Sequence, residues 1–286
     1  MRFRTEIETS KAPFQITYAD KIALLGSCFS DNIARRLEQN YFRVVANPTG
    51  TLYNPVSIAR HIDDENVRDA DVFIITFGTA WVYIDINQKS QITNQKSRWS
   101  AVVDNCQKRP ASDFIRYRLT VNEIVEIWQP VLEKHPNKRF IFTVSPIRHL
   151  KDGLHENNLS KSILLLAIER LIGEAGLTAQ RSTFQQAKPV YFEAFEIMLD
   201  DLRDYRFYSD DLLHPNPAGI SYIWEHFVAA FMSDSTEREM KQLYALWLNR
   251  NHRSLFPDSP ADKQFKARTD EQFRALKERY PWLPES

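Results

Sequence analysis

The chain has little of what marks a secreted, membrane or nucleic-acid-binding protein. Only two of its 286 residues are cysteines, Cys28 and Cys106, which argues against a small disulfide-stapled scaffold. The longest apolar run, residues 163–168, is far shorter than the roughly 18 residues of a membrane span. The 37 basic and 37 acidic residues cancel to a net charge of +0, whereas nucleic-acid-binding domains carry a basic excess or stripe. We therefore expect no nucleic-acid partner and no membrane span.

Several short motifs are also missing. The first fourteen residues are charged and contain no apolar core of a signal peptide, which predicts a cytoplasmic protein with reduced thiols. No Cys-x-x-Cys or His-x-x-x-His spacing is present, and no glycine-rich phosphate-binding loop occurs. We therefore expect no metal and no nucleotide or other cofactor.

What is present is an alternation of strand-like and helical segments. Apolar runs that predict strands lie at residues 21–25, 42–47, 71–78, 139–146 and 188–195. Helical spacing of apolar residues recurs at 30–40, 119–135, 160–176 and 216–232. Strands that alternate with helices predict an α/β domain, with a mostly parallel sheet and helices on both faces. Ligands of such sheets bind beyond the carboxyl ends of the strands.

Helix-capping residues and an irregular region complete this outline. Ser30 or Asp31 is the predicted cap of the first helix, and Ser160 is that of the helix over 160–176. Residues 79–118 fit no simple strand–helix unit and predict an insertion at the carboxyl edge of the sheet, with an antiparallel hairpin arm at 83–92. Residues 1–235 are the predicted main domain, and the charged residues 236–286 predict a helical C-terminal extension.

Two nucleophile-type residues follow the first predicted strand, in the tetrapeptide Gly26-Ser27-Cys28-Phe29. A side chain at this place projects from the sheet edge, and the free N–H groups of the next helix lower a thiol pKa and stabilise an oxyanion. Gly26 allows the backbone to approach a substrate closely. The alternative is a tight turn that contains a small buried cysteine.

A carboxylate and an imidazole lie three residues apart near the last helix of the predicted domain. Asp211 precedes His214, and Pro215 and the helical pattern over 216–232 follow directly. This spacing lets Asp211 hold the Nδ1–H of the ring, so that Nε2 faces a nucleophile. The alternative is a helix cap provided by Asp210 or Asn216, with an exposed His214.

This layout resembles the SGNH/GDSL hydrolases, and the residues Gly-Ser-Cys-Phe resemble the name-giving motif of the GSCFA-domain family within that superfamily. The resemblance covers roughly residues 14–235 and implies a three-layer, flavodoxin-like α/β fold. Its further motifs are NPTGTLYNP at 47–55, TFGTAWVY at 76–83, TVSPIRH at 143–149, KDGLHENNLSKSILL at 151–165 and DDLLHPN at 210–216.

The resemblance also implies roles for single residues. Aligned on the Gly-Asp-Ser-Leu motif without a gap, Cys28 takes the nucleophile position, and Ser27 is the second candidate. His214 matches the base of the family and Asp211 its orienting acid. The backbone N–H groups of Gly50 and Cys28 match two donors of the oxyanion hole.

One position departs from the superfamily. An asparagine that completes the oxyanion hole commonly follows the third strand, but here Ala80 stands at that place. Thr79, Trp81 or Asn47 are the candidates to replace its amide donor. After the fourth strand, Arg148 and His149 are candidates to bind a carboxylate or sugar hydroxyls. His149 is also the rival base, and the alternative for Arg148 is a structural ion pair.

Together these features predict a bacterial acyl-ester hydrolase of the esterase or deacetylase type, acting on an acylated carbohydrate or small metabolite. An O-acyltransferase of polysaccharide metabolism is the first alternative, in which an acceptor hydroxyl replaces water. A non-catalytic carbohydrate-binding module on an SGNH-like scaffold is the second, favoured by the absent asparagine. The acyl group, the alcohol partner and the oligomeric state have no signature in the sequence.

Overall fold

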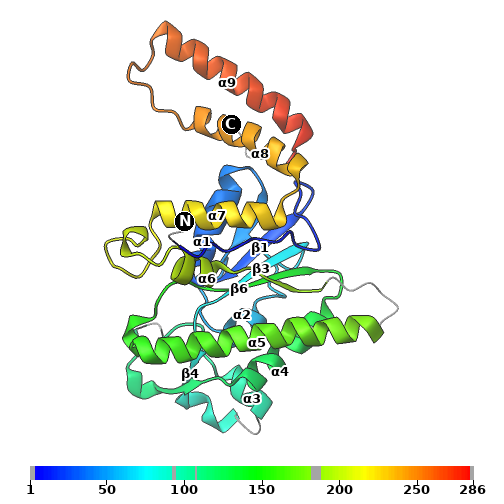
Figure 1. The fold of residues 1–286 in the computed structure, drawn as a ribbon, viewed down its shortest axis with the longest axis vertical. Coiled ribbons are helices and arrows are strands. Elements are labelled where there is room, and N and C mark those ends of the chain that lie inside the picture. Colours follow the sequence, from blue (N-terminus) through cyan, green and yellow to red (C-terminus); the bar gives the residue numbers. More distant parts are fainter. Residues whose placement is uncertain (1–3, 92–94, 107, 182–187, 284–286) are drawn as a thin grey trace.

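The computed structural model describes residues 4–91, 95–106, 108–181 and 188–283. Its centre is a five-stranded parallel sheet with the order β2–β1–β3–β6–β7 (Figure 1). The strands are β1 (Lys21–Gly26), β2 (Arg43–Ala46), β3 (Val72–Phe77), β6 (Arg139–Val144) and β7 (Val190–Tyr191). This flavodoxin-like order reverses between β1 and β3, and ligands of such sheets bind at the carboxyl edge beside that point. The predicted fold class and the first four predicted strands are confirmed, whereas the strand expected at 188–195 is reduced to the two residues of β7, and residues 194–195 begin a helix.

Two apolar cores lie on opposite faces of this sheet because side chains alternate along each strand. Ile22 and Leu24 of β1 belong to the first core, whereas Ala23 and Leu25 belong to the second. The first face is covered by α1 (Cys28–Gln39), α6 (Ala194–Glu196), the π-helical turn η4 (Ile197–Asp201) and α7 (Pro217–Phe231). The second face is covered by α2 (Pro55–Arg60), α4 (Val121–Lys134) and α5 (Leu154–Arg181) (Figure 1). The architecture therefore has the three predicted layers.

The predicted insertion lies between β3 and α4. Strands β4 (Trp81–Asp85) and β5 (Phe114–Arg118) pair antiparallel. The arm expected at 83–92 is a strand only up to Asp85, and the prediction is wrong for residues 86–91, which form a 3-10 helix. Val82 and Ile84 of β4 join the second core. The other insertion elements are η1 (Ile86–Gln91), α3 (Gln95–Ser100) and η2 (Ala111–Asp113). Residues 92–94 and 107 of this region lie outside the described residues.

Two predicted helix starts are wrong. Helix α1 begins at Cys28 and is capped by Ser27, because the tight turn at Gly26 already directs the chain into the helix. Helix α5 begins at Leu154, right after Gly153 with its positive φ of 80°, so Ser160 lies inside the helix. There its hydroxyl accepts a hydrogen bond from the backbone N–H of Ala80 at 2.8 Å. By contrast, α7 starts within the predicted segment, and its cap is Asn216, one of the two residues that the structural alternative named.

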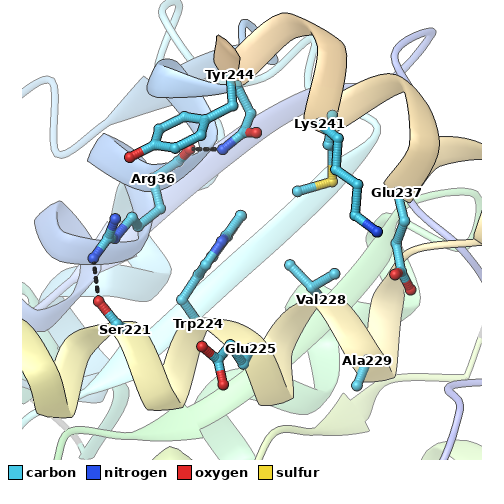
Figure 2. A pocket seen from close by; sticks show the side chains of 11 residues that line it. Arg36, Ser221, Trp224, Glu225, Val228, Ala229, Glu237, Lys241 and Tyr244 are labelled. Atoms are coloured by element: carbon cyan, nitrogen blue, oxygen red, sulfur yellow. Dashed lines mark hydrogen bonds between the residues drawn. The ribbon is translucent and has the colours of Figure 1, made fainter. Parts of the chain in front are cut away.

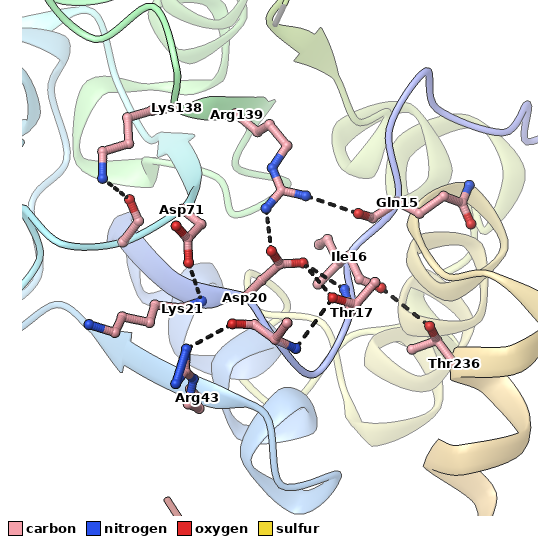
Figure 3. Close-up of polar contacts among 12 residues, drawn as sticks. Gln15, Ile16, Thr17, Asp20, Lys21, Arg43, Asp71, Lys138, Arg139 and Thr236 are labelled. Atoms are coloured by element: carbon pink, nitrogen blue, oxygen red, sulfur yellow. Dashed lines mark hydrogen bonds and ion pairs between the residues drawn. The ribbon is translucent and has the colours of Figure 1, made fainter. Parts of the chain in front are cut away.

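A polar network closes the amino edge of the sheet (Figure 3). Arg139 at the start of β6 forms an ion pair with Asp20 and donates to the carbonyl of Gln15 at 3.0 Å. The backbone N–H of Lys21 donates to the Asp71 carboxylate at 2.8 Å, and the Lys138 ammonium donates to the Ala70 carbonyl. These bonds tie the N-terminal segment to β1, β3 and β6.

The C-terminal region forms two further helices, α8 (Asp234–Arg250) and α9 (Pro260–Arg279), as predicted. They run as a pair beyond α7 (Figure 1), and Phe273 and Tyr280 join the first core. The indole N–H of Trp282 donates to the carbonyl of Tyr41 at 3.2 Å. Among the described residues, no helix combines the length and the apolarity needed to cross a membrane. The boundary at residue 235 stays a prediction.

Candidate active site

A strained glycine turn places the predicted nucleophile at the carboxyl edge of β1. Gly26 has a φ of 145°, and a Cβ atom there would lie 2.2 Å from the carbonyl oxygen of Thr76 on β3. Its N–H donates to Asn47 Oδ1 at 2.9 Å, and the N–H of Ser27 donates to the Thr76 carbonyl at 3.3 Å. Only glycine fits this position, so the turn is anchored to the strands on both sides.

Ser27 and Cys28 have different environments. The side chain of Ser27 is buried, and its Oγ accepts a hydrogen bond from the N–H of Phe29 as the cap of α1. Cys28 is the first residue of the helix and is partly exposed. Its thiol lies where the free N–H groups of the helix N-terminus point. The structure therefore uses Ser27 as a helix cap and directs Cys28 outward.

The loop before α7 holds the imidazole in one orientation. Asp211 Oδ1 accepts from the backbone N–H groups of Leu213 and His214 at 2.9 and 3.0 Å. Its Oδ2 lies 2.5 Å from His214 Nδ1. The N–H groups of His214 and Leu213 lower the pKa of Asp211 to about 2, so the carboxylate is ionised at neutral pH. An ionised Asp211 favours the tautomer with the proton on Nδ1, which leaves Nε2 as an acceptor.

The two motifs meet although 186 positions separate them in the sequence. His214 Nε2 lies 3.5 Å from Cys28 Sγ. The side chains of His214 and Asp211 are 43% and 45% exposed, so water reaches the pair. Burial raises the pKa of the Cys28 thiol, and the carboxylate of Asp31 raises it further. Because the thiol then keeps its proton at neutral pH, a nearby base is needed to activate it.

The expected oxyanion donors are engaged in other hydrogen bonds. The N–H of Gly50 donates to the Asn47 carbonyl at 2.8 Å, and the N–H of Thr79 donates to the Tyr53 carbonyl at 2.9 Å. The Thr79 hydroxyl lies 3.1 Å from the hydroxyl of Ser160. The amide of Asn47 donates to Asp31 at 2.8 Å. In this conformation, the N–H of Cys28 at the start of α1 is the predicted donor that the helix itself leaves free.

The predicted substrate-binding residues divide into two groups. Arg148 donates to Tyr208 at 2.7 Å, so it binds tyrosines rather than the carboxylate that the structural alternative required. His149 lies close enough to His214 for their charges to interact, and burial, followed by the positive charges of Lys161 and His214, lowers its pKa to about 4. Trp81 instead stacks under Arg116 on β5, with the guanidinium 3.7 Å from the ring centre.

Sequence reasoning missed a buried lysine and a tyrosine. Lys161 of α5 is 1% exposed, and its ammonium donates to the carbonyls of Gly78 and Ser145, both at 2.7 Å. Tyr53 packs its ring edge-on against His149, with 5.7 Å between ring centres, and burial and then Cys28 raise its pKa. Lys161 lies in a mostly polar segment that is typical of a solvated helix start, so only its membership of the motif at 151–165 could have indicated a role.

Two concave surfaces are relevant to ligands. A cavity of about 250 Å³ is bordered by Arg148, Lys161 and Tyr205 and lies beside the carboxyl edge of β6. A second, of about 460 Å³, lies between α1, α7 and α8 and includes Trp224 and Tyr244 (Figure 2). Neither cavity is lined by Cys28 or His214. Within the described residues, no three histidine, cysteine or acidic side chains are grouped to hold a metal ion.

The chain matches one known protein family. The model of the GSCFA family matches residues 21–66 and 63–227, which include Cys28, Asp211 and His214. No curated protein matches the chain.

Solved structures show weak similarity. A gut microbial diltiazem-metabolizing enzyme is 15% identical, with a TM-score of 0.41; the match covers 78% of this chain but 48% of that protein, so the chain spans about half its length. A GDSL-like lipase from Bacteroides thetaiotaomicron is 10% identical with a TM-score of 0.42, and 78% of this chain and 88% of the lipase are covered. An acetylxylan esterase from Geobacillus stearothermophilus, a catalytic mutant, is 12% identical with a TM-score of 0.44, over 79% and 96% of the chains.

Proposed function

The chain belongs to the GSCFA family, and from this premise we propose that it is an acyl-ester hydrolase with Cys28 as its nucleophile. One observation carries the proposal: the two ring nitrogens of His214 face Cys28 and Asp211. Nε2 lies 3.5 Å from Cys28 Sγ, and Nδ1 lies 2.5 Å from Asp211 Oδ2. A nucleophile next to a base, with the base held by an acid, is the arrangement of covalent acyl transfer. Ser27 remains the second candidate, although its role as helix cap favours Cys28.

The proposed reaction has two steps. His214 Nε2 takes the thiol proton while Cys28 Sγ bonds to the acyl carbon, and the ester C–O bond breaks as His214 returns the proton to the leaving alcohol. His214 then takes a proton from water as the oxygen attacks the thioester, and the C–S bond breaks as His214 returns this proton to the sulfur, which releases the carboxylic acid and restores the thiol. Asp211 stabilises the imidazolium that forms in both steps.

The developing oxyanion needs donors near Cys28. The N–H of Cys28 is positioned at the helix N-terminus to serve as one of them. Gly50 and Thr79 can contribute only after their N–H groups leave the carbonyls of Asn47 and Tyr53. We therefore propose that substrate binding rearranges the turn at 47–50, and that the site is less fully formed before the substrate arrives.

The substrate is proposed to be an acylated carbohydrate or a small metabolite. The cavity bordered by Arg148 and Tyr205 offers a cation and one phenolic hydroxyl, which suit sugar hydroxyls or a carboxylate. The exposure of His214 favours hydrolysis over transfer to an acceptor hydroxyl, because water reaches the base directly. Both cysteines are free thiols, so we place the activity in the reducing cytoplasm.

Intact-mass spectrometry with p-nitrophenyl acetate tests the nucleophile. We expect one acetyl adduct on the wild-type chain that disappears in Cys28→Ala, forms more slowly in His214→Ala and persists in Ser27→Ala. Cys106→Ala is the matched control, because Cys106 is the other free, partly exposed thiol. Loss of the adduct in Ser27→Ala alone would move the nucleophile one residue back. An adduct spread over lysines and indifferent to all four changes would contradict the hydrolase and favour a binding module.

A further inference from the structure

A hydroxyl, an imidazole and a carboxylate follow one another beside the turn at residues 47–50. Thr49 Oγ1 lies 3.4 Å from Nδ1 of His61, the residue that ends α2. Nε2 of the same ring lies 2.9 Å from one carboxylate oxygen of Asp104, which comes from the insertion between β3 and α4. The Arg60 guanidinium donates to the other oxygen at 2.5 Å. This Thr49–His61–Asp104 relay links the insertion to the turn and has no role in the reaction described above.

The carboxylate of the relay decides which ring nitrogen of His61 carries the proton. With Asp104 beside Nε2, the neutral ring keeps its proton on Nε2 and leaves Nδ1 as an acceptor. The Thr49 hydroxyl then donates to Nδ1. This tautomer is the opposite of the one at His214, whose Nδ1 faces its carboxylate. Asp104 thus orients the ring, and the ring holds the side chain of Thr49.

The turn is also anchored to the glycine turn of the proposed nucleophile, on both sides of Thr49. Before Thr49, the side-chain oxygen of Asn47 accepts from the N–H of Gly26 at 2.9 Å. After it, the N–H of Leu52 donates to the Gly26 carbonyl at 3.0 Å. The ends of the segment are therefore fixed to the residue that directs the chain into Ser27 and Cys28, and the relay fixes its middle.

The peptide between Thr49 and Gly50 is the part of the turn with room to move. Gly50 has a φ of 95°, and a Cβ atom placed there would have no atom of the described residues within 4 Å. Its N–H donates to the Asn47 carbonyl at 2.8 Å, so this peptide must rotate before the N–H reaches an oxyanion. Glycine tolerates the rotation, and fixed neighbours confine the rotation to this peptide.

We propose that His61 is a positioning residue: it fixes Thr49, so that substrate binding turns only the peptide that carries the Gly50 N–H toward the oxyanion. This inference rests on the proposed function, in which Gly50 becomes an oxyanion donor after the turn rearranges. Donors stabilise an oxyanion best when they are held in place before the reaction. Without the relay, Thr49 and the next N–H would take several orientations, and alignment of the donor would raise the barrier.

Two reactions of Cys28 separate the oxyanion donor from the nucleophile. Acetylation by p-nitrophenyl acetate passes through an oxyanion, whereas alkylation by iodoacetamide is a substitution at a saturated carbon and forms none. Both rates are measured in a Cys106→Ser background, so that Cys28 is the one reacting thiol of the chain. A residue that acts only on the oxyanion donor changes the first rate and leaves the second unchanged.

The relay is opened at its exposed end. Thr49→Val removes the hydroxyl and keeps the shape of the side chain, and Thr49→Ser is the conservative variant that keeps the hydroxyl. Thr9→Val is the matched control, because Thr9 Oγ1 also lies beside a ring Nδ1, at 2.5 Å from His226 on α7. Urea unfolding verifies that each variant is folded.

In Thr49→Val we expect the acetylation rate to fall about tenfold, a part of the roughly 10²- to 10³-fold cost of losing a whole oxyanion donor. The alkylation rate should be unchanged. Thr49→Ser and Thr9→Val should both keep the parent rates. A folded Thr49→Val variant with the parent acetylation rate would overturn the proposal. An equal fall of both rates would overturn it too, because the relay would then hold the nucleophile rather than the donor.

Amide hydrogen exchange of Gly50, followed by NMR, tests the anchor of the turn without any ester. The Gly50 N–H should exchange faster in Thr49→Val and in His61→Gln, which opens the relay from its other side, than in the parent protein. Unchanged exchange in both variants contradicts the inference. Faster exchange in a protein whose Cys28 is alkylated but never acetylated would keep the anchor and overturn the hydrolase proposal, so the two failures are distinguishable.

Discussion

The two edges of the parallel sheet use charge in opposite ways. At the amino edge, Arg139 forms an ion pair with Asp20, and the backbone N–H at the start of β1 donates to the carboxylate of Asp71 (Figure 3). At the carboxyl edge, the buried Lys161 binds the backbone carbonyls of Gly78 and Ser145, and the negative charge of Asp31 raises the pKa of the Cys28 thiol. The amino edge therefore stabilises the fold, whereas the carboxyl edge holds charges in an arrangement suited to chemistry.

This contrast follows from what the fold places at each edge. In a parallel sheet the strand ends with free carbonyl groups, the starts of the following helices and the longest loops all meet at the carboxyl edge. Backbone groups there are available to hold side chains that would otherwise need carboxylate partners. Substitutions at the two edges should consequently affect different properties, and the following predictions separate them.

The largest effect is expected at the carboxyl edge from Asp211→Asn. The amide keeps the size of the side chain but stabilises the wrong imidazole tautomer and no longer stabilises the imidazolium. We expect the rate of ester hydrolysis to fall by about 10²-fold or more, with little change in the midpoint of urea unfolding. Steady-state kinetics measures the hydrolysis rate, and urea denaturation measures the stability. A variant that loses stability but keeps its hydrolysis rate would contradict the assignment of the carboxyl edge to chemistry.

A smaller effect on the stability of the fold is expected when acid protonates His149. Its pKa in the folded protein, about 4, lies below the ordinary value of 6.5, so the unfolded chain binds the extra proton first as the pH falls. The stability is therefore complete above pH 6.5 and is lost as the pH falls from there toward 4, by about 2 to 3 kcal/mol over that window. Urea unfolding at several pH values measures it.

The matched variant for this prediction is His149→Gln, which removes the titrating group. The difference in unfolding free energy between pH 6.5 and pH 4 should shrink in this variant by the amount assigned to His149. Equal pH dependence in both proteins would show that His149 is not the group that loses stability in acid.

The smallest of these effects is expected at the amino edge from Arg139→Met. The variant leaves the Asp20 carboxylate half-buried without its cation, which should lower the free energy of unfolding by about 2 kcal/mol. The hydrolysis rate of the folded variant should be unchanged, because Arg139 lies at the opposite end of β6 from Lys161 and His149. A change in the rate with unchanged stability would contradict the assignment of the amino edge to the fold alone.

Much of the architecture could be predicted from local patterns. The buried strands β3 and β6 are continuous apolar runs, and α7 begins at Asn216 and Pro217 with a normal cap. Helix starts were predicted less well. The cap of α1 was missed because Gly26 turns the chain so tightly that the residue directly after it becomes the cap. The polar residues before Ser160 hid the first turns of α5, whose apolar spacing begins only afterwards.

The sequence by itself determined the parallel α/β sheet, the carboxyl edge as the place of the candidate site, and the Asp211–His214 pair, because each depends on residues close together in the chain. Only the tertiary structure decided that Cys28 rather than Ser27 faces His214, that the N–H groups of Gly50 and Thr79 are already engaged, and that the buried Lys161 binds the carbonyl of Gly78. These facts depend on how β3, β6, α5 and the loop before α7 meet. Contacts between such distant segments arise from packing, which no local pattern of residues encodes.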